Sequence, residues 1–243
     1  MSLTRLSTGL KFTAAAMAPY NTTPKYALFA LKTPSFDSYA AFFQMRGTAS
    51  DGYDGYHNLI LQYGMYVVLE DRGRNYGAPL GVSVKADPGY NLSADGKVNK
   101  WTWFLIHIDS LSARGFRVGG SVDFTVGGTF NTPAAISRME IGWGLPDSAK
   151  IAHVHWFSAL SLTQYNAIVA GTLDPSTVET LIDGFTFKSG MSSVKGLLTA
   201  TPYNATTPPQ IDSSDDPVVG SSPGGVTPPA GDTLIRRSGG FGW

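Results

Sequence analysis

The acidic residues of this chain lack the arrangement that glycoside hydrolysis requires. That reaction needs two carboxyl groups around one bond, one to protonate the leaving oxygen and one to attack or to activate water. Glu70 and Asp71 are adjacent, so on a strand they would point to opposite faces. Glu140 has no acidic residue two or four positions later. We therefore expect a protein that is not an enzyme.

Two carboxylates and two aromatic rings lie close together in residues 51–56. The members of this group are Asp51, Tyr53, Asp54 and Tyr56. Carboxylate oxygens are suitable ligands for Ca²⁺, and tyrosine rings present a flat apolar face to a sugar ring. The spacing matches no fixed calcium code, and an Asp-Gly pair is equally typical of a hairpin turn. A carbohydrate site, with or without calcium, and a simple turn both stay open, and no other cofactor is indicated.

Two histidines, His153 and His155, are two positions apart. On a strand their imidazoles share one face, about 7 Å apart along the chain. Such a pair ligates zinc when a third ligand converges, but the chain contains no cysteine to complete a soft site. We expect both side chains on the surface or at an edge of a sheet, and no metal. His107 lies in an apolar segment and is expected to be half-buried and hydrogen-bonded.

The charge composition excludes several classes of partner. The 243 residues include 18 basic and 18 acidic side chains, so no global field gathers nucleic acid or an anionic membrane. No stretch approaches the roughly 18 apolar residues of a membrane-spanning helix. The absence of cysteine excludes disulfides and cysteine nucleophiles. We expect neither nucleic acid nor a membrane as a partner.

Apolar and polar residues alternate with a period of two over much of the chain. The alternation is clear over 121–126 and 137–143. Further strands are predicted at 9–13, 26–32, 39–46, 57–62, 65–70, 80–85, 101–109 and 181–188. Turn sequences such as Asp-Gly, Asp-Pro-Gly and Gly-Gly separate these segments. Many strands without regular helices between them favour an antiparallel β-sandwich over a parallel α/β sheet.

Capping residues predict one helix. Ser161 and Gln164 form a capping box, residues 162–170 follow, and Gly171 supplies the left-handed stop. A second short helix is predicted to begin at Asp174-Pro175.

The composition changes near residue 200. Residues 201–243 are rich in Pro, Gly and Ser, and they contain too little apolar surface to offset their own ordering entropy. We therefore predict a β-sandwich over residues 1–200 and an extended C-terminal arm over residues 201–243.

Three motifs resemble one fold family. Residues 150–187 resemble the closing segment of laminin-G-like domains, with an aromatic-ending strand, Ala-Leu-Ser, a helix and a last strand. Lys-Trp-Thr-Trp at 100–103 and Arg-Met-Glu-Ile-Gly at 138–142 resemble two strands of the same domains. The chain thus resembles the concanavalin A-like lectin and glucanase superfamily, in particular laminin-G-like domains of bacteriophage and prophage virion proteins. The resemblance spans most of residues 8–190. It implies an antiparallel jelly-roll β-sandwich with one or two short helices.

The end of the chain carries a short apolar and basic motif with aromatic residues. Its members are Leu234, Ile235, Arg236, Arg237, Phe241 and Trp243. Aromatic anchors on an extended arm are a common route to assembly, so we expect these residues to bind a partner rather than their own domain.

Two functions follow from the residues and the resemblance. The first is a non-enzymatic virion structural protein, a capsid decoration or tail accessory module made in the host cytoplasm. It would bind other virion proteins in many copies within a symmetric assembly. The alternative is a lectin-like module that recognises host surface carbohydrate through residues 51–56, assisted by calcium. The two functions can coexist.

Overall fold

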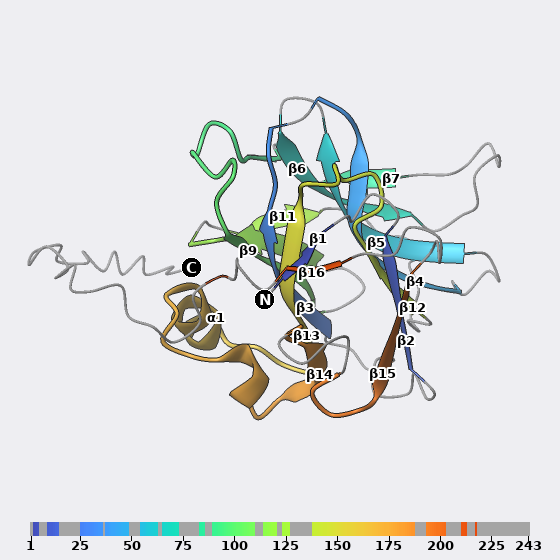
Figure 1. Ribbon diagram of the computed structural model, residues 1–243, viewed down its shortest axis with the longest axis vertical. Coiled ribbons are helices and arrows are strands. Elements are labelled where there is room, and N and C mark those ends of the chain that lie inside the picture. The colour runs from blue at the N-terminus through green and yellow to red at the C-terminus, as the bar shows by residue number, and fades with distance from the viewer. Residues whose placement is uncertain are drawn as a thin grey trace, which may run out of the picture.

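The computed structural model describes residues 2–4, 9–14, 25–35, 37–48, 54–62, 65–72, 83–85, 89–109, 114–120, 123–126, 138–187, 193–202, 210–212 and 217. These residues form two stacked eight-stranded sheets with an α-helix on the outside (Figure 1). Each pairing between strands is antiparallel, so the predicted antiparallel β-sandwich is confirmed.

The first sheet, sheet A, has the strand order β11-β10-β9-β3-β13-β1-β16, and β14 also pairs with β13. Its strands are β1 (Ser2–Thr4), β3 (Lys25–Lys32), β9 (Thr102–Ile108), β10 (Arg114–Val118), β11 (Phe124–Val126), β13 (Lys150–Phe157), β14 (Leu181–Phe185) and β16 (Gln210–Asp212).

The second sheet, sheet B, has the order β15-β2-β12-β4-β5-β6-β7, and β8 also pairs with β6. Its strands are β2 (Leu10–Ala14), β4 (Ala40–Thr48), β5 (Asp54–Gln62), β6 (Tyr66–Arg72), β7 (Ser83–Lys85), β8 (Tyr90–Asn91), β12 (Arg138–Ile141) and β15 (Leu198–Pro202).

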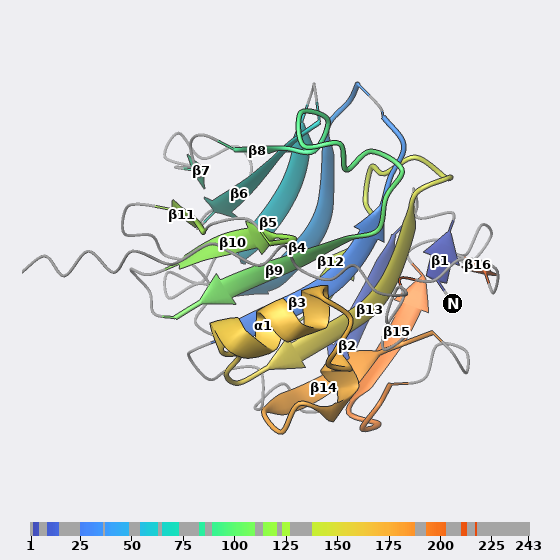
Figure 2. The same cartoon turned by 90° about the vertical axis from the view of Figure 1, so that its left-hand side faces the viewer.

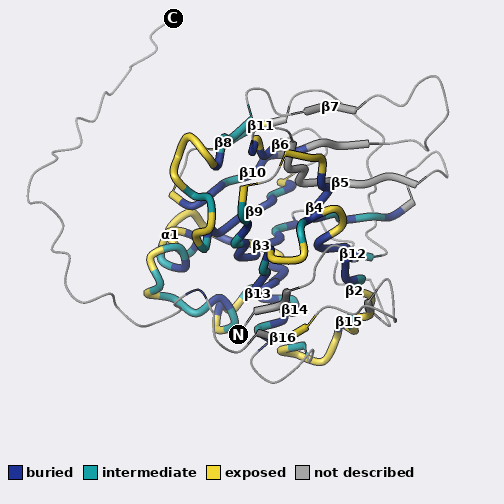
Figure 3. The backbone as a smooth tube through the Cα atoms, turned by 45° about the horizontal axis from the view of Figure 1, so that its top comes forward, coloured by how far each residue is buried: buried dark blue, intermediate teal, exposed yellow. Residues whose placement is uncertain are grey.

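The main core lies between the two sheets, where the inward residues of each alternating strand meet. The ring of Phe29 on β3 stacks on Phe43 of β4 and Phe104 of β9, with centroids 4.8 and 5.4 Å away. All three rings are fully buried, and burial of one such side chain contributes about 2 kcal/mol. Figure 3 shows the buried residues concentrated in the strands and the exposed ones in the connecting loops.

The predicted capping box is present. The backbone N–H of Gln164 donates to Ser161 Oγ at 3.2 Å, and that of Ser161 donates to Gln164 Oε1 at 2.9 Å. Helix α1 follows at Leu162–Val169. The second predicted helix is a short 3₁₀ helix, η3 (Pro175–Thr177), with Asp174 as its N-cap. In the part of the chain that the structure describes, no helix has the length and apolar character needed to cross a membrane.

A second apolar cluster lies on the outer face of sheet A. Leu28, Leu105 and Phe157 point outward from β3, β9 and β13, and Tyr165 and Ile168 of α1 pack against them. Figure 2 shows α1 lying along this face of the sheet. This packing fixes the start of α1 close to the ends of β9 and β10.

The sandwich includes strand residues on both sides of the predicted boundary at residue 200. β15 pairs with β2 and crosses that boundary, and β16 pairs with β1. The buried carboxylate of Asp183 attaches the segment before β15, because it accepts backbone N–H groups of Lys195, Leu197 and Leu198. Residues 218–243, most of the predicted arm, lie outside the described residues.

Candidate functional site

A polar pocket of about 160 Å³ lies where the end of β9 meets the start of α1. Its floor is the outer face of sheet A, and its wall is the chain from Leu160 into α1. The polar side chains that line it are those of Tyr26, His107, Asp109, Arg117 and Asp123, with Ser161 at the start of the wall.

Cross-strand register brings these side chains together. Tyr26 on β3 pairs with His107 on β9, and His107 pairs with Gly115 on β10. One step along the same face, Leu105 pairs with Arg117. Because residues two apart on a strand share a face, Tyr26, His107 and Arg117 all lie on the outer face of sheet A, towards α1.

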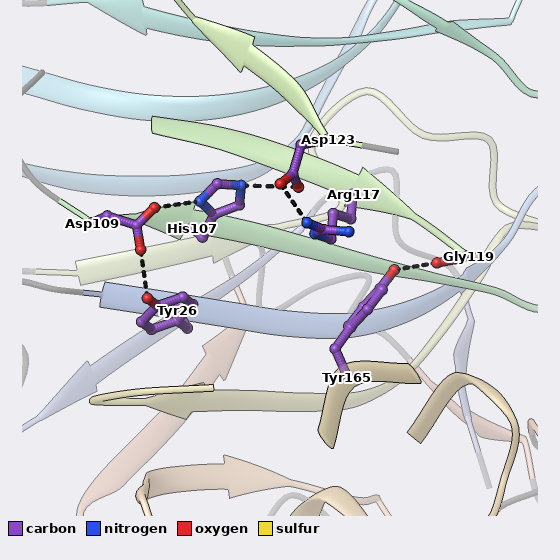
Figure 4. A network of polar contacts seen from close by, with 7 residues as sticks. All are labelled: Tyr26, His107, Asp109, Arg117, Gly119, Asp123 and Tyr165. Carbon is purple, nitrogen blue, oxygen red and sulfur yellow. Dashed lines mark hydrogen bonds and ion pairs between the residues drawn. The ribbon is translucent and has the colours of Figure 1, made fainter. Parts of the chain in front are cut away.

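A chain of polar contacts crosses the pocket floor (Figure 4). The Tyr26 hydroxyl donates to one carboxylate oxygen of Asp109, and the other oxygen lies 2.8 Å from His107 Nδ1. On the far side of the imidazole, Nε2 lies 3.3 Å from Asp123 Oδ1. Arg117 donates to the second oxygen of Asp123. The imidazole therefore separates two carboxylates, and each carboxylate has a second partner that holds it in place.

The hydrogen bonds assign the imidazole proton of His107 to Nδ1. An ionised carboxylate only accepts, so the nitrogen at 2.8 Å from Asp109 must donate. At Nε2 the contact with Asp123 lacks hydrogen-bond geometry, although this nitrogen is buried. A hydrogen bond therefore holds the ring of His107 on its Asp109 side only.

The surroundings shift two pKa values in this group. Burial raises the pKa of Tyr26, and the hydrogen bond to Asp109 and the charge of that carboxylate raise it further, to about 12. Burial alone would also raise the pKa of Asp109, but hydrogen bonds from Tyr26 and His107 outweigh it and lower this pKa below its usual value. Asp109 is thus ionised at neutral pH, while Tyr26 keeps its proton.

The ring of His107 lies over a glycine of the neighbouring strand. A Cβ atom at Gly115 would come within 2.8 Å of His107 Nε2 and 2.7 Å of the Phe124 carbonyl oxygen. Both distances are shorter than real Cβ contacts, so a side chain here would push the ring or the strand aside. Because Gly115 has no side chain, the imidazole of His107 has room to lie beside Asp123.

Tyr165 fixes the wall of the pocket. Its ring is buried, and its hydroxyl donates to the carbonyl oxygen of Gly119 at 2.6 Å, just past the end of β10. Burial raises the pKa of Tyr165, so the hydroxyl remains a donor. This bond ties α1 to β10 and sets the position of Leu160 and Leu162, the apolar part of the wall. Leu162 remains 51% exposed.

Negative charge dominates the accessible part of the pocket. The side chains of Asp109 and Asp123 are 45% and 32% exposed, against 20% for Arg117 and 12% for His107. A ligand that enters the pocket therefore meets carboxylate oxygens first. Each oxygen has two lone pairs, so besides the contacts described it can accept a hydrogen bond from a ligand hydroxyl.

A second ionic group lies on sheet B. Glu140 on β12 is 3% exposed, and its carboxylate oxygens lie 2.7 Å from Arg138 Nε and 3.3 Å from Arg46 Nη1. The two arginines neutralise and cover this carboxylate, so little of it is left for a ligand. We assign it a structural role in holding β12 against β4, with which it pairs.

The side chains predicted to bind sugar or a partner lie outside the described part of the structure. Asp51 and Tyr53 lie outside the described residues, and the side chains of Asp54 and Tyr56 do as well, although both residues belong to β5. The predicted partner-binding residues also lie outside the described residues; they are Leu234, Ile235, Arg236, Arg237, Phe241 and Trp243.

The sequence predicted the surroundings of His107 but not the pocket. His107 is partly buried and hydrogen-bonded, as predicted. Asp109, two positions later, is a local signal that another polar group shares its face. Arg117 lies on β10 and Asp123 just before β11, and only the folded structure shows that Asp123 contacts both His107 and Arg117.

The predicted exposure of His153 and His155 is wrong. They are 1% and 0% exposed, because β13 lies between β3 and β14 within sheet A and η3 packs against it. A bulge at His153, whose φ is +53°, shifts the register with β3 between Ala152 and His155. The two imidazoles stack with their centroids 6.1 Å apart. Both rings are therefore part of the packed interior beside η3.

Metal binding finds no support in the described part of the chain. There, no three His, Asp or Glu side chains are grouped so as to hold an ion. The pocket carboxylates are engaged by Tyr26, His107 and Arg117 instead. Calcium binding was predicted for residues 51–56, whose side chains lie outside the described residues, so it stays a prediction.

Known structures share this fold. A candidate carbohydrate-binding protein from Bacteroides ovatus superposes with a TM-score of 0.56 and 14% identity, over 90% of this chain and 61% of that one. The binding domain of botulinum neurotoxin serotype C1 gives a TM-score of 0.48 with 12% identity, over 68% of this chain and 41% of that one. The binding domain of botulinum neurotoxin DC, in complex with SialylT, gives 0.47 and 10% identity, over 67% and 39%.

These likenesses concern the fold. The chain spans less than two thirds of the length of these proteins. The first likeness supports the β-sandwich fold, and the laminin-G and bacteriophage assignment stays a prediction. No protein-family model and no curated protein sequence matches the chain.

Proposed function

We propose that this chain is a carbohydrate-binding module and that the pocket between sheet A and α1 holds the sugar. The observation that carries the proposal is a polar floor opposite an apolar wall within one small pocket. A sugar ring has the same two sides, with hydroxyl groups around its rim and CH groups on its faces. Asp109 and Asp123 accept hydrogen bonds from the hydroxyls, while Leu162 contacts the CH groups.

The pocket is organised before a ligand arrives. Tyr26 and His107 hold Asp109, and Arg117 holds Asp123, so the acceptors need little further ordering on binding. A small number of fixed polar groups beside an apolar surface is the usual composition of a small-molecule site.

The same geometry favours binding over hydrolysis. His107 fills the space between Asp109 and Asp123, where a glycosidase would place the bond to be cleaved. A general acid needs a raised pKa, whereas the pKa of Asp109 is lowered. The similar structure from Bacteroides ovatus is described as a candidate carbohydrate-binding protein, which agrees with a non-enzymatic role.

The virion role predicted from the resemblance stays a separate hypothesis. It depends on the arm over residues 201–243, most of which lies outside the described residues. A sugar-binding sandwich attached to a virion by that arm would combine both functions, with a host surface glycan as ligand and other virion proteins as partners.

A glycan array followed by calorimetry tests the proposed function. We expect the purified chain to bind a subset of printed glycans, and Asp109→Asn to weaken that binding about tenfold, or roughly 1.4 kcal/mol. The variant loses one acceptor and places an amide opposite the donors Tyr26 and His107.

Asp37→Asn is the matched control, because it removes one exposed carboxylate outside the pocket. Its affinity should equal that of the unmodified chain. Binding to no glycan, or equal affinity in Asp109→Asn, would contradict the proposal. Thermal unfolding of each variant shows whether the fold is intact.

A further inference from the structure

We propose, resting on the proposed function, that the pocket takes a single uncharged sugar residue at the end of a glycan and disfavours acidic sugars such as sialic acid. Three features of the pocket carry this inference: its volume, its charge and its apolar wall.

The volume fits one sugar ring. The pocket holds about 160 Å³, whereas sites for drug-sized ligands hold roughly 300–1,000 Å³. It corresponds to about five water molecules at their volume in the liquid. Leu160 and the buried ring of Tyr165 close it on the side of α1. A residue at the end of a glycan needs only one open side to enter such a pocket, whereas a residue inside a chain needs room for a neighbour on each side.

Carboxylates are the most accessible charges of the pocket. Asp109 and Asp123 carry two negative charges, and Arg117 carries one positive charge that is already paired with Asp123. The side chains of Asp109 and Asp123 are also more exposed than those of Arg117 and His107. The N-terminus of α1 adds roughly half a positive charge, which is less than the charge of one carboxylate. An acidic ligand would therefore be repelled, above all by Asp109, whose side chain is the most exposed of these four.

Hydrogen bonding gives the same preference. Carboxylate oxygens only accept, so a ligand must donate to Asp109 and Asp123. Sugar hydroxyls supply such donors. The ionised acid of sialic acid has no proton to donate, and it would displace water from Asp109 without replacing its hydrogen bonds.

The wall adds an apolar contact at a fixed place. Leu162 is the first residue of α1, lines the pocket and is 51% exposed. The capping box at Ser161 and the bond from Tyr165 to Gly119 hold this turn of the helix. A ring that donates to the carboxylates therefore turns its CH groups towards Leu162.

Matched pairs of glycans test the ligand class. Oligosaccharides that end in a neutral residue are compared on one array with the same oligosaccharides capped by sialic acid, at a single salt concentration. We expect the uncapped member of each bound pair to bind at least about tenfold more tightly. We also expect the free monosaccharide of the terminal residue to compete for binding.

Two variants connect the preference to the pocket. Asp109→Asn should reduce the preference for uncapped glycans several-fold, since it removes the most exposed carboxylate, and Asp37→Asn should leave it unchanged. Capped glycans that bind as tightly as uncapped ones would overturn this inference and leave the proposed function standing. Competition by longer oligosaccharides alone would overturn the single-residue site. Binding to no glycan at all would overturn both proposals.

Discussion

Single histidines in this fold differ sharply in their surroundings. His107 has a carboxylate on each side, whereas the ring of His155 is fully buried in the interior of the fold. Burial lowers the pKa of His155 to about 4, and the neighbouring His153 contributes to this shift. The backbone of His153 and the charges of Asp174 and Asp183 favour the protonated ring, but they do not cancel the lowering of this pKa.

We predict that the buried His155 makes the fold less stable in acid. In the unfolded chain this group binds a proton below its ordinary pKa of 6.5, while in the folded chain it stays neutral down to about 4. The unfolded state therefore binds more protons in this window, and the free energy of unfolding falls as the pH is lowered. The stabilisation is complete above pH 6.5, and about 3 kcal/mol is lost by pH 4. Urea unfolding at a series of pH values measures this loss.

His155→Phe isolates this contribution, because it keeps a flat ring in the stack with His153 and removes the titrating group. Its free energy of unfolding should change less between pH 4 and pH 6.5 than that of the unmodified chain. Equal pH dependence in both proteins would show that His155 does not titrate as described.

Pairs of neighbouring strands in sheet A share one packing arrangement, an imidazole over a glycine. His107 on β9 lies over Gly115 on β10, and His155 on β13 lies over Gly184 on β14. An added Cβ at Gly184 would stand 2.4 Å from His155 Cδ2. In both pairs the glycine has no side chain, so the imidazole can lie close to the neighbouring strand. The ring of His155 does so in the interior, and the ring of His107 does so at the pocket floor.

We predict that Gly115→Ala damages the pocket without removing any polar group. The new methyl group would displace the His107 ring, so sugar binding should weaken about tenfold and stability should fall by about 1–3 kcal/mol. Calorimetry and urea unfolding measure the two effects. Gly120→Ala is the matched control, since an added Cβ there meets no atom within 4 Å. If Gly115→Ala bound sugar as well as Gly120→Ala, the imidazole would not be positioned by this glycine.

Most elements could be predicted from local patterns. The strand predicted at 26–32 is β3, and the capping box at Ser161 marks the start of α1. β10 was missed because Phe116 and Val118 alone mark its buried face, which is too short a pattern to stand out. The bulge at His153 was missed because nothing in the residue types signals it.

The pocket could not be predicted in the same way. His107 and Asp109 are neighbours in sequence, but Arg117 reaches the same place only because β10 pairs with β9 in one particular register. Tyr165 depends on how α1 docks on the sheet. Register and docking result from packing across the whole core, and a one-residue slip would place the same side chains on the opposite face.

Each of the two sheets carries a group of ionic side chains on its outer face. The two groups differ in how accessible their carboxylates are to a ligand. On sheet A the carboxylates of Asp109 and Asp123 stay accessible beside α1. On sheet B the carboxylate of Glu140 is covered by Arg46 and Arg138. The stacking of two sheets with one outer helix thus leaves one of these groups accessible in a pocket, and the central claim is that this pocket is where sugar binds.

An NMR titration of the isotope-labelled chain with a sugar selected on the array tests that claim most directly. We expect the largest amide shift changes to cluster at His107, Asp109 and Leu162 and to saturate at a single affinity. Shift changes centred on Arg46, Arg138 and Glu140, with the pocket residues unmoved, would place the sugar on sheet B and rule out the pocket as its site.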